Sequence, residues 1–190
     1  MAKEKLPVTP VGIASYPHLL EVYDESGKFE ITQIFGPKAD TAELERIIED
    51  AAKLRWPDKK KRPANFRNPL RNAEEKEGDA GYEDAVSFAK FKTNRRPKVR
   101  KLEGKEIVEV EIEVDSDGKK FSNDLYAGMK GVVSYSAKAY SKDGGNGVSL
   151  YLINYLKVGE GEPIGGISSD PDEDFEGIEA EVDDDLEAAF

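Results

Sequence analysis

Two alternating segments near the end of the sequence constrain its fold most strongly. Residues 130–141 (KGVVSYSAKAYS) and 148–158 (VSLYLINYLKV) are apolar and β-prone, and the connection KDGGNG lies between them. Alternation with period two is typical of strands with one buried face, and a glycine-rich connection is typical of a hairpin. The pattern therefore predicts an antiparallel pair of strands.

The alternation also predicts which side chains of this hairpin share a face. In the second segment three leucines alternate with two tyrosines and a lysine, namely Leu150, Leu152 and Leu156 against Tyr151, Tyr155 and Lys157. If the leucines point inward, the tyrosines and the lysine lie on the exposed face. In the first segment, Lys138 and Tyr140 likewise share a face. The alternative is that the tyrosines are buried beneath a loop or a helix.

Four further segments have the composition of strands. Residues 11–23 and 28–35 are apolar and β-prone, and the turn sequence DESGK separates them. Residues 85–93 (AVSFAKFKT) alternate, and residues 105–114 (KEIVEVEIEV) alternate acidic with aliphatic side chains. We expect residues 11–23 and 28–35 to form a pair of strands, and each of the other two segments to form one strand, that over residues 105–114 with a solvated face.

One helix is predicted from about residue 41 to residue 55. Asp40 is placed to cap its first turn, with Glu43 three residues later as the second half of a capping box. Pro57 ends the helix, and residues 57–83 contain Pro, Asn, Gly and charged residues without periodicity. We expect a long loop there.

The segments together predict a mainly β fold with one helix. Several short strands, a helix between early strands and long basic loops fit a partly open, five-stranded barrel of the OB-fold type. A β-sandwich is the alternative, because the pattern does not define the order of the strands.

Charge is distributed unevenly along the chain, whose net charge is −11. Residues 158–190 contain 13 acidic residues and no Lys or Arg, so residues 1–157 carry 26 acidic against all 28 basic residues. Residues 53–101 are the most basic part, with 16 basic and 7 acidic residues. A segment as acidic as the C-terminal one does not form a core. We therefore predict an OB-fold domain over residues 1–158 and a disordered acidic tail over residues 159–190.

Basic residues are interleaved with aromatic ones in two stretches that contain no acidic residue. These are KKKRPANFRNPLR (59–71) and FAKFKTNRRPKVRK (88–101). Single-stranded DNA is bound by such combinations, because cations follow the phosphates and flat rings stack on exposed bases. The alternative is that the charges only solvate loops and that Phe88 lies in the core. The predicted DNA-binding residues are Lys59, Lys60, Lys61, Arg62, Phe66, Arg67, Arg71, Phe88, Lys90, Phe91, Lys92, Arg95, Arg96, Lys98, Arg100, Lys138, Tyr140, Tyr151, Tyr155 and Lys157.

The end of the tail combines acidic residues with a terminal aromatic residue. A run of this kind often serves only solubility. Joined to a basic body, however, it can compete with phosphates for the same groove, and a terminal Phe offers partner proteins an apolar anchor. The predicted partner-binding residues are Asp183, Asp184, Asp185, Leu186 and Phe190.

Signatures of catalysis, metals and membranes are absent from the sequence. The single histidine, His18, lies in an apolar segment, there is no cysteine, and no phosphate-binding GxxxxGK[ST] loop occurs. We therefore expect no enzymatic activity, no cofactor and no metal. No apolar run is long enough to span a membrane, and no secretory signal is visible. We expect a cytoplasmic protein.

Two segments resemble a known family. YAGMKGVVSYSAKAYSKDGGNGVSLYLINYLKVGEGEPIGG (126–166) and the terminal DDDLEAAF are similar to phage-encoded single-stranded DNA-binding proteins with an OB fold. The resemblance implies non-specific binding of single-stranded DNA, tail contacts with replication proteins, and the cytoplasm of an infected bacterium as the location. Bacterial tails of this kind usually end in Pro-Phe, whereas this chain ends in Ala-Ala-Phe.

The sequence thus predicts a protein that coats single strands during phage replication, recombination or repair. Such binding would be nearly independent of base sequence, because stacking and phosphate contacts read no base edge. One alternative is an interaction adaptor whose acidic tail mimics DNA. Another is a metal-dependent nuclease.

Overall fold

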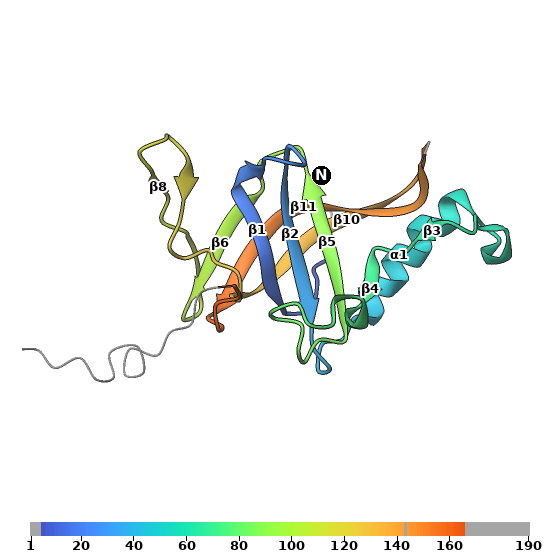
Figure 1. Cartoon of the computed structure of the whole chain (residues 1–190), viewed down its shortest axis with the longest axis horizontal. Helices are drawn as coiled ribbons and strands as arrows, with labels where there is room; N and C mark the ends of the chain where they lie inside the picture. The colour runs from blue at the N-terminus through green and yellow to red at the C-terminus, as the bar shows by residue number, and fades with distance from the viewer. Residues whose placement is uncertain (1–4, 143, 166–190) are drawn as a thin grey trace, which may run out of the picture.

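Five strands form a closed ring (Figure 1). The structure is a computed structural model that describes residues 5–142 and 144–165. In order around the ring, the strands are β1 (Gly12–Tyr23), β2 (Lys28–Phe35), β5 (Ser87–Thr93), β11 (Gly145–Gly159) and β10 (Lys130–Lys142). Each strand pairs with the next, and β10 pairs with β1. The expected five-stranded barrel is confirmed, and a β-sandwich is excluded.

The ring closes where β5 meets β11. This pairing is parallel and covers two positions, Phe91 opposite Leu150 and Lys92 opposite Tyr151. The other four pairings of the ring are antiparallel. The predicted final hairpin is therefore present as β10 and β11, and its second strand also completes the barrel.

The interior of the ring holds the largest buried side chains. Phe35, Phe91, Tyr135 and Tyr155 are all fully buried there, and the rings of Phe91 and Tyr135 lie 5.5 Å apart between centroids. Burial of aromatic side chains supplies much of the stability of a core of this size.

A β-bulge in β11 reverses the alternation that the sequence suggests. Ser134 pairs with Asn154 and Tyr135 pairs with Leu152, so Ile153 is an extra residue without a partner on β10. An extra residue moves every following side chain to the opposite face. Tyr155 therefore points into the barrel, although alternation from Leu150 and Leu152 places it outside.

Helix α1 (Ala42–Arg55) packs against β10 and β11. Its buried face consists of Leu44, Ile48, Ala51 and Ala52. The helix was expected from residue 41 and begins one residue later. The expected capping box is wrong, because Thr41 occupies the N-cap position. Asp40 accepts a hydrogen bond from the N–H of Ala42 at 3.0 Å and thereby still serves the first turn.

α1 is the only α-helix in the two described ranges, and it is too short to cross a membrane. The segment expected to be a long loop contains four short elements. They are η1 (Lys59–Lys61), β3 (Phe66–Arg67), β4 (Leu70–Asn72) and η2 (Ala73–Lys76). β3 pairs with β11 and β4 pairs with β5, so this segment borders the barrel on its outer side.

Two small hairpins lie at the end of the molecule away from α1 (Figure 1); the first extends the main sheet, because its first strand pairs in parallel with β11, and the second projects from the barrel. They consist of β6 (Lys98–Glu103) with β7 (Glu106–Glu109), and β8 (Glu113–Val114) with β9 (Lys120–Phe121). The single strand expected over residues 105–114 is therefore wrong. Val110 is buried in the core, whereas Ile107, Ile112 and Val114 are exposed, so one continuous strand has no face to bury.

Candidate nucleic-acid interface

A groove of about 780 Å³ crosses the outer surface of the barrel where β5 meets β11. Seven basic residues line it, namely Lys28, Arg67, Arg71, Lys76, Lys90, Lys92 and Lys142. Five aromatic residues line it as well, namely Tyr16, Tyr82, Phe88, Tyr140 and Tyr151. No Asp or Glu is among the lining residues. The groove therefore presents positive charge and flat rings together.

Strand β5 supplies the floor of the groove through its alternation. Phe88, Lys90 and Lys92 are on the outer face of β5 and line the groove, whereas Ala89 and Phe91 point inward and are fully buried. Phe88 is itself buried, in an apolar cluster with Tyr82, so the alternative expected for it, a place in a core, is what the structure shows. The sequence pattern FAKFK therefore separates its two phenylalanines. Phe91 was expected to bind DNA, and this expectation is wrong, because its ring lies inside the barrel.

The approach of β3 to β11 brings Arg67 to the groove. Arg67 pairs with Gly147, and a Cβ atom at that glycine would lie 2.4 Å from the carbonyl oxygen of Arg67. Any larger residue would push β3 away. Gly147 belongs to the glycine-rich connection expected to turn the hairpin. Its missing side chain also lets the basic strand β3, distant in sequence, pack against β11.

Tyr16 is the most exposed aromatic side chain of the groove. It lies in an irregular stretch of β1 between Ser15 and His18, and 65% of its surface is exposed. Its φ angle of 48° is the only positive value among the non-glycine residues that the structure describes. Such a conformation is unfavourable for a bulky residue and often marks a functional position. Tyr151, on β11, is 42% exposed.

Acidic partners hold several of the groove cations from outside its lining. Lys90 and Lys92 both contact the buried carboxylate of Glu30, at 3.0 and 3.5 Å. Arg71 pairs with Glu75, and its guanidinium lies 5.2 Å from the centroid of the Phe88 ring. These contacts fix the cations at the groove surface without placing an acidic side chain in the lining.

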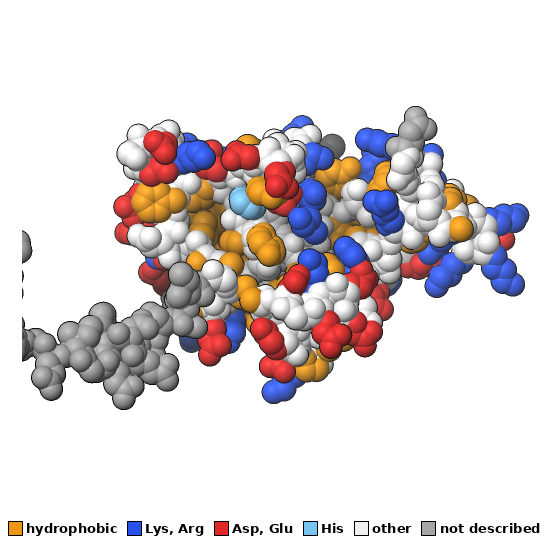
Figure 2. All heavy atoms as spheres, viewed as in Figure 1, with side chains coloured by type: hydrophobic (Ala, Val, Ile, Leu, Met, Phe, Trp, Pro, Cys, Tyr) orange, Lys and Arg blue, Asp and Glu red, His pale blue; other side chains and the backbone are white. Residues whose placement is uncertain are grey.

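Seven of the residues predicted from the sequence meet in the groove. They are Arg67, Arg71, Phe88, Lys90, Lys92, Tyr140 and Tyr151. Figure 2 shows this face of the molecule, with basic side chains from the region of β5 to the end that carries α1 and β3. The remaining predicted residues lie elsewhere.

Most of these remaining residues lie on the surface at other places. Lys59, Lys60 and Lys61 form η1, beyond the end of α1, and Lys138 is exposed on β10. Arg95 and Arg96 lie between β5 and β6, and Lys98 and Arg100 lie in β6. Of these, Arg96 donates a hydrogen bond to the carbonyl of Leu20, and Arg100 pairs with Glu109 at 2.7 Å.

Arg62 and Phe66 form part of a structural contact beside α1. The Arg62 guanidinium makes a bidentate pair with Glu49 at 2.7 and 2.9 Å, and its carbon Cζ lies 5.2 Å from the centroid of the Phe66 ring. Trp56 packs edge-on against Phe66. This arrangement ties the basic segment after the helix to the helix itself.

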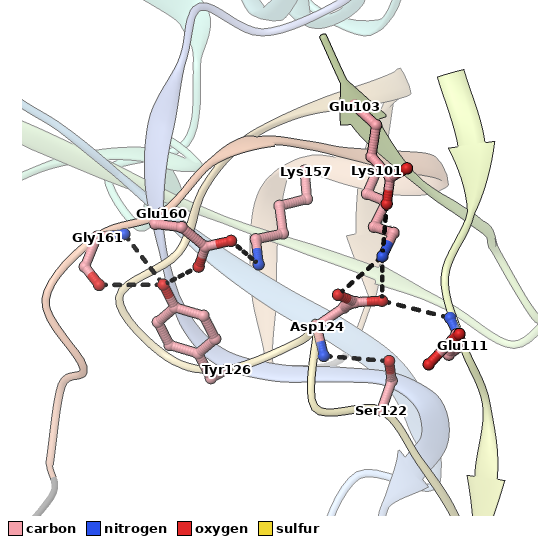
Figure 3. Close-up of polar contacts among 9 residues, drawn as sticks. All are labelled: Lys101, Glu103, Glu111, Ser122, Asp124, Tyr126, Lys157, Glu160 and Gly161. Carbon is pink, nitrogen blue, oxygen red and sulfur yellow. Dashed lines mark hydrogen bonds and ion pairs between the residues drawn. The ribbon is translucent and has the colours of Figure 1, made fainter. Parts of the chain in front are cut away.

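The prediction that Tyr155 and Lys157 bind DNA is wrong, because the bulge at Ile153 turns both side chains away from the expected face. Tyr155 is 1% exposed in the barrel, and burial raises the pKa of its hydroxyl far above the ordinary value. Lys157 is also buried, and its Nζ pairs with Glu160 at 2.7 Å and lies 5.0 Å from the centroid of the Tyr126 ring (Figure 3). Neither side chain is available to DNA in this structure.

The contacts of Lys157 belong to a latch that fastens the chain after β11. We define the latch as Tyr126, Lys157, Glu160, Gly161 and Ile164. The Tyr126 hydroxyl lies 2.6 Å from Oε2 of Glu160 and accepts a hydrogen bond from the N–H of Gly161 (Figure 3). Hydrogen bonds from Lys157 and Tyr126 lower the pKa of the Glu160 carboxyl.

Three residues of the latch, Glu160, Gly161 and Ile164, lie beyond the predicted domain boundary at residue 158, and the latch is close to the groove. Ile164 donates a backbone hydrogen bond to Ala127 and packs against the apolar cluster that contains Tyr82 and Phe88. Both aromatic residues also line the groove. The tail residues predicted to bind partners, Asp183, Asp184, Asp185, Leu186 and Phe190, lie outside the described residues.

Sequence reasoning missed Tyr16, Lys28, Lys76, Tyr82 and Lys142 as groove residues. Tyr16 stands beside a proline in a segment rich in apolar residues, where nothing marks it as exposed. Lys76 and Tyr82 belong to an acidic part of the long segment before β5. Lys142 directly precedes the DGGNG connection, so its position beside a predicted tyrosine face was a usable signal.

No cluster of three or more metal-ligating side chains occurs within the described ranges. The groove contains lysines, arginines, tyrosines and neutral polar groups. Such a lining can bind an extended polyanion whose bases are exposed, because the cations contact its phosphates and the aromatic rings stack on its bases.

Comparison with known proteins places these features in a family. Residues 11–187 match the sequence model described as "Enterobacter phage Enc34, ssDNA-binding protein". The solved structure of the single-stranded DNA-binding protein from bacteriophage Enc34 superposes with a TM-score of 0.61 at 18% identity, covering 88% of each chain. The same bacteriophage protein in complex with ssDNA gives a TM-score of 0.60 at 18% identity, covering 83% of this chain and 88% of the other. No curated protein sequence matches the chain.

Proposed function

Because this chain belongs to the family of the Enterobacter phage Enc34 ssDNA-binding protein, we propose that it binds single-stranded DNA along the groove between β5 and β11. The observation that carries the proposal is the lining of the groove, with seven basic and five aromatic residues and no acidic one. The solved Enc34 protein in complex with ssDNA supports the same partner.

Binding of this kind is independent of base sequence. The lysines and arginines contact phosphates, and the exposed rings of Tyr16 and Tyr151 stack on bases, which all have a flat face. A single strand can splay its bases onto the rings, whereas a duplex keeps them stacked inside. We therefore propose that the protein coats transient single strands during phage replication, recombination or repair.

The acidic tail has two roles in this proposal. Its charges compete with DNA for the groove, and its terminal residues Leu186 and Phe190 bind replication or recombination proteins. Two observations support the competition. Residues 158–190 hold 13 acidic residues, and the latch holds the start of this segment against the cluster that backs the groove. DNA in the groove would then release the tail to its partners.

Salt-dependent titration tests the main proposal. A labelled oligo-dT strand is titrated by fluorescence anisotropy at several salt concentrations, with a duplex of equal length as comparison. We expect preference for the single strand and a linear fall of log affinity with log salt, with a slope of about −0.7 per phosphate contact. Affinity that is independent of salt, or a preference for the duplex, would contradict the proposal.

Two matched pairs of variants locate the site. Tyr151→Ala should weaken binding by about 1–3 kcal/mol. Phe121→Ala is its control, because Phe121 is similarly exposed but lies on β9, outside the groove.

Lys28→Ala should reduce the salt slope by about 0.7. Lys105→Ala, at the exposed turn between β6 and β7, should leave the slope unchanged. Equal effects within a pair would place the DNA elsewhere.

A further inference from the structure

Beneath the groove lies a buried carboxylate, that of Glu30 on β2. Glu30 is 2% exposed and is paired across the sheet with Lys92. Its carboxylate accepts hydrogen bonds at 3.0 Å from both Lys90 and Ser26, and Nζ of Lys92 lies 3.5 Å away. One anion thus contacts both ammonium groups that β5 presents to the groove.

The surroundings of Glu30 keep it ionised. Its burial by itself would raise the pKa of the carboxyl, but the hydrogen bonds from Lys90 and Ser26 and the charges of Lys90 and Lys92 outweigh this effect. The net result is a pKa below the ordinary value of a glutamate. Glu30 therefore carries a full negative charge at neutral pH.

A buried negative charge is unexpected beneath a surface proposed to bind a polyanion. It repels phosphates, and removal of a carboxylate from water is unfavourable unless paired cations compensate. If the charge of the groove alone mattered, an apolar or neutral residue at this position would serve DNA binding better. The position of the carboxylate between two lysines suggests what it contributes instead.

Lysine side chains lose considerable conformational freedom when they are fixed on a ligand. A free lysine side chain samples many rotamers, and this side-chain entropy is lost on ordering. Glu30 holds both lysines before any ligand arrives, so this loss is already incurred in the free protein. Each ammonium group has three N–H donors. Lys90 donates one of them to the carboxylate, whereas Lys92 lies 3.5 Å from it as an ion pair. The side chains of Lys90 and Lys92 are 44% and 42% exposed, so the other donors can reach a ligand.

We infer that Glu30 is a positioning residue that fixes Lys90 and Lys92 as a single phosphate-binding subsite for one nucleotide of the strand. Tyr151 lies directly opposite Lys92 across the β5–β11 seam, so a base attached to the bound phosphate can stack on its ring. The ligand class is a phosphodiester of single-stranded DNA. The inference rests on the proposed function and adds an internal organisation to the site.

Substitution of Glu30 by glutamine separates positioning from simple electrostatics, because the two predict opposite signs. If Glu30 only reduced the positive charge of the groove, Glu30→Gln would strengthen binding of oligo-dT. If Glu30 positions the lysines, the same variant should bind several-fold more weakly, although it is more positive. Its salt slope should also become less negative, by about 0.7 for each phosphate that the lysines no longer bind.

Three variants complete the test. Glu109→Gln removes a carboxylate that pairs with Arg100 outside the groove, and it should leave affinity and slope unchanged. In a background with Lys90→Ala and Lys92→Ala, Glu30→Gln should no longer weaken binding, because the lysines that it positions are gone. Glu30→Asp keeps the buried charge but shortens its reach, so it should also weaken binding. This variant decides the question if Glu30→Gln does not fold.

Each variant is checked by circular dichroism and thermal unfolding, and the titrations are made well below its unfolding transition. Equal or tighter binding by Glu30→Gln with an unchanged slope would overturn the inference. So would a weakening of equal size in the background without the two lysines. Failure of the unmodified protein to bind oligo-dT would instead overturn the proposed function, so the two failures are distinguishable.

Discussion

At the scale of single residues, Tyr16 combines strain with exposure. A left-handed conformation costs a non-glycine residue about 1–2 kcal/mol, and the exposed ring of Tyr16 gains little burial in compensation. We therefore expect Tyr16→Gly to raise the free energy of unfolding by about 1 kcal/mol, because glycine adopts this backbone without strain.

The same variant should lose affinity for oligo-dT by about 1–3 kcal/mol, because a stacking ring is removed. Tyr16→Ala is the control, since it removes the ring but keeps the strain. It should show the loss of affinity without the gain in stability. Thermal unfolding and anisotropy titrations measure the two effects. A stabilised Tyr16→Gly protein with unchanged DNA affinity would show that the strain has no part in binding.

Tyr135 provides a prediction about alkaline pH. Burial raises the pKa of its hydroxyl to about 12, and the nearby charge of Glu43 adds to the effect. An unfolded tyrosine ionises near pH 10, so the folded state keeps a proton that the unfolded state releases. The free energy of unfolding is therefore unaffected by the ionisation of this group below pH 10, and it falls as the pH rises from 10 toward 12.

Each unit of difference between the folded and unfolded pKa corresponds to about 1.4 kcal/mol of stability lost at alkaline pH. Tyr135→Phe has no hydroxyl to ionise, so it should lose less stability as the pH rises. It should also raise stability at neutral pH by roughly 1 kcal/mol, because the buried hydroxyl has no hydrogen-bond partner among the described residues. Denaturant unfolding at pH 8 and pH 11 measures both effects. Equal losses between the two pH values in both proteins would contradict the assignment.

At the scale of elements, regular pattern was predictable and local irregularity was not. The β10–β11 hairpin and the helix follow from periodicity, because half-buried strands and helices repeat their apolar residues. The bulge at Ile153 has no such signal, since an extra aliphatic residue in a run of aliphatic residues leaves the composition unchanged. That one residue moved Tyr155 from the predicted site to the core.

The groove shows the same division. Lys90, Lys92 and Tyr151 were predictable because alternation within one strand defines their face. Tyr16 and Lys28 were not, because their places depend on how strands distant in sequence meet around the ring. Strand β6 was missed because KVRKLE follows the interrupting NRRP and has few apolar residues.

The latch after β11 supplies a prediction at this scale. Tyr126→Phe removes the hydroxyl that contacts Glu160 and Gly161 and keeps the ring near Lys157. We expect faster amide hydrogen exchange at Gly161 and Ile164, with a loss of overall stability of about 0.5–1.5 kcal/mol. Tyr23→Phe, which removes a hydroxyl outside the latch, should leave exchange at both amides unchanged. Unaltered exchange in Tyr126→Phe would show that the segment is held by packing alone.

At the scale of the whole molecule, the charge distribution predicts intramolecular competition. Tethered groups reach effective concentrations in the millimolar range, so the tail need not bind the groove tightly to affect DNA binding. A protein without residues 170–190 should bind oligo-dT more tightly than the full chain, most clearly at low salt where screening is weakest.

Removal of Phe190 alone is the matched control for this comparison. It removes no charged side chain, so DNA affinity should remain that of the full chain while partner binding is lost. Anisotropy titrations of the three proteins at two salt concentrations measure the difference. Equal affinities of the full-length and truncated proteins at low salt would leave the tail with a docking role only.

The seam between β5 and β11 has a consequence for the durability of the barrel. It pairs over two positions, as does the β1–β10 pairing, whereas β2 and β5 pair over seven, so these two seams are where the ring should open most readily. The groove straddles the β5–β11 seam, with Lys90 and Lys92 on one side and Ser149 and Tyr151 on the other. A strand of DNA bound to both sides would hold β5 and β11 together. It would therefore slow amide exchange in these two strands more than in β1. Bound DNA would then stabilise the barrel that binds it.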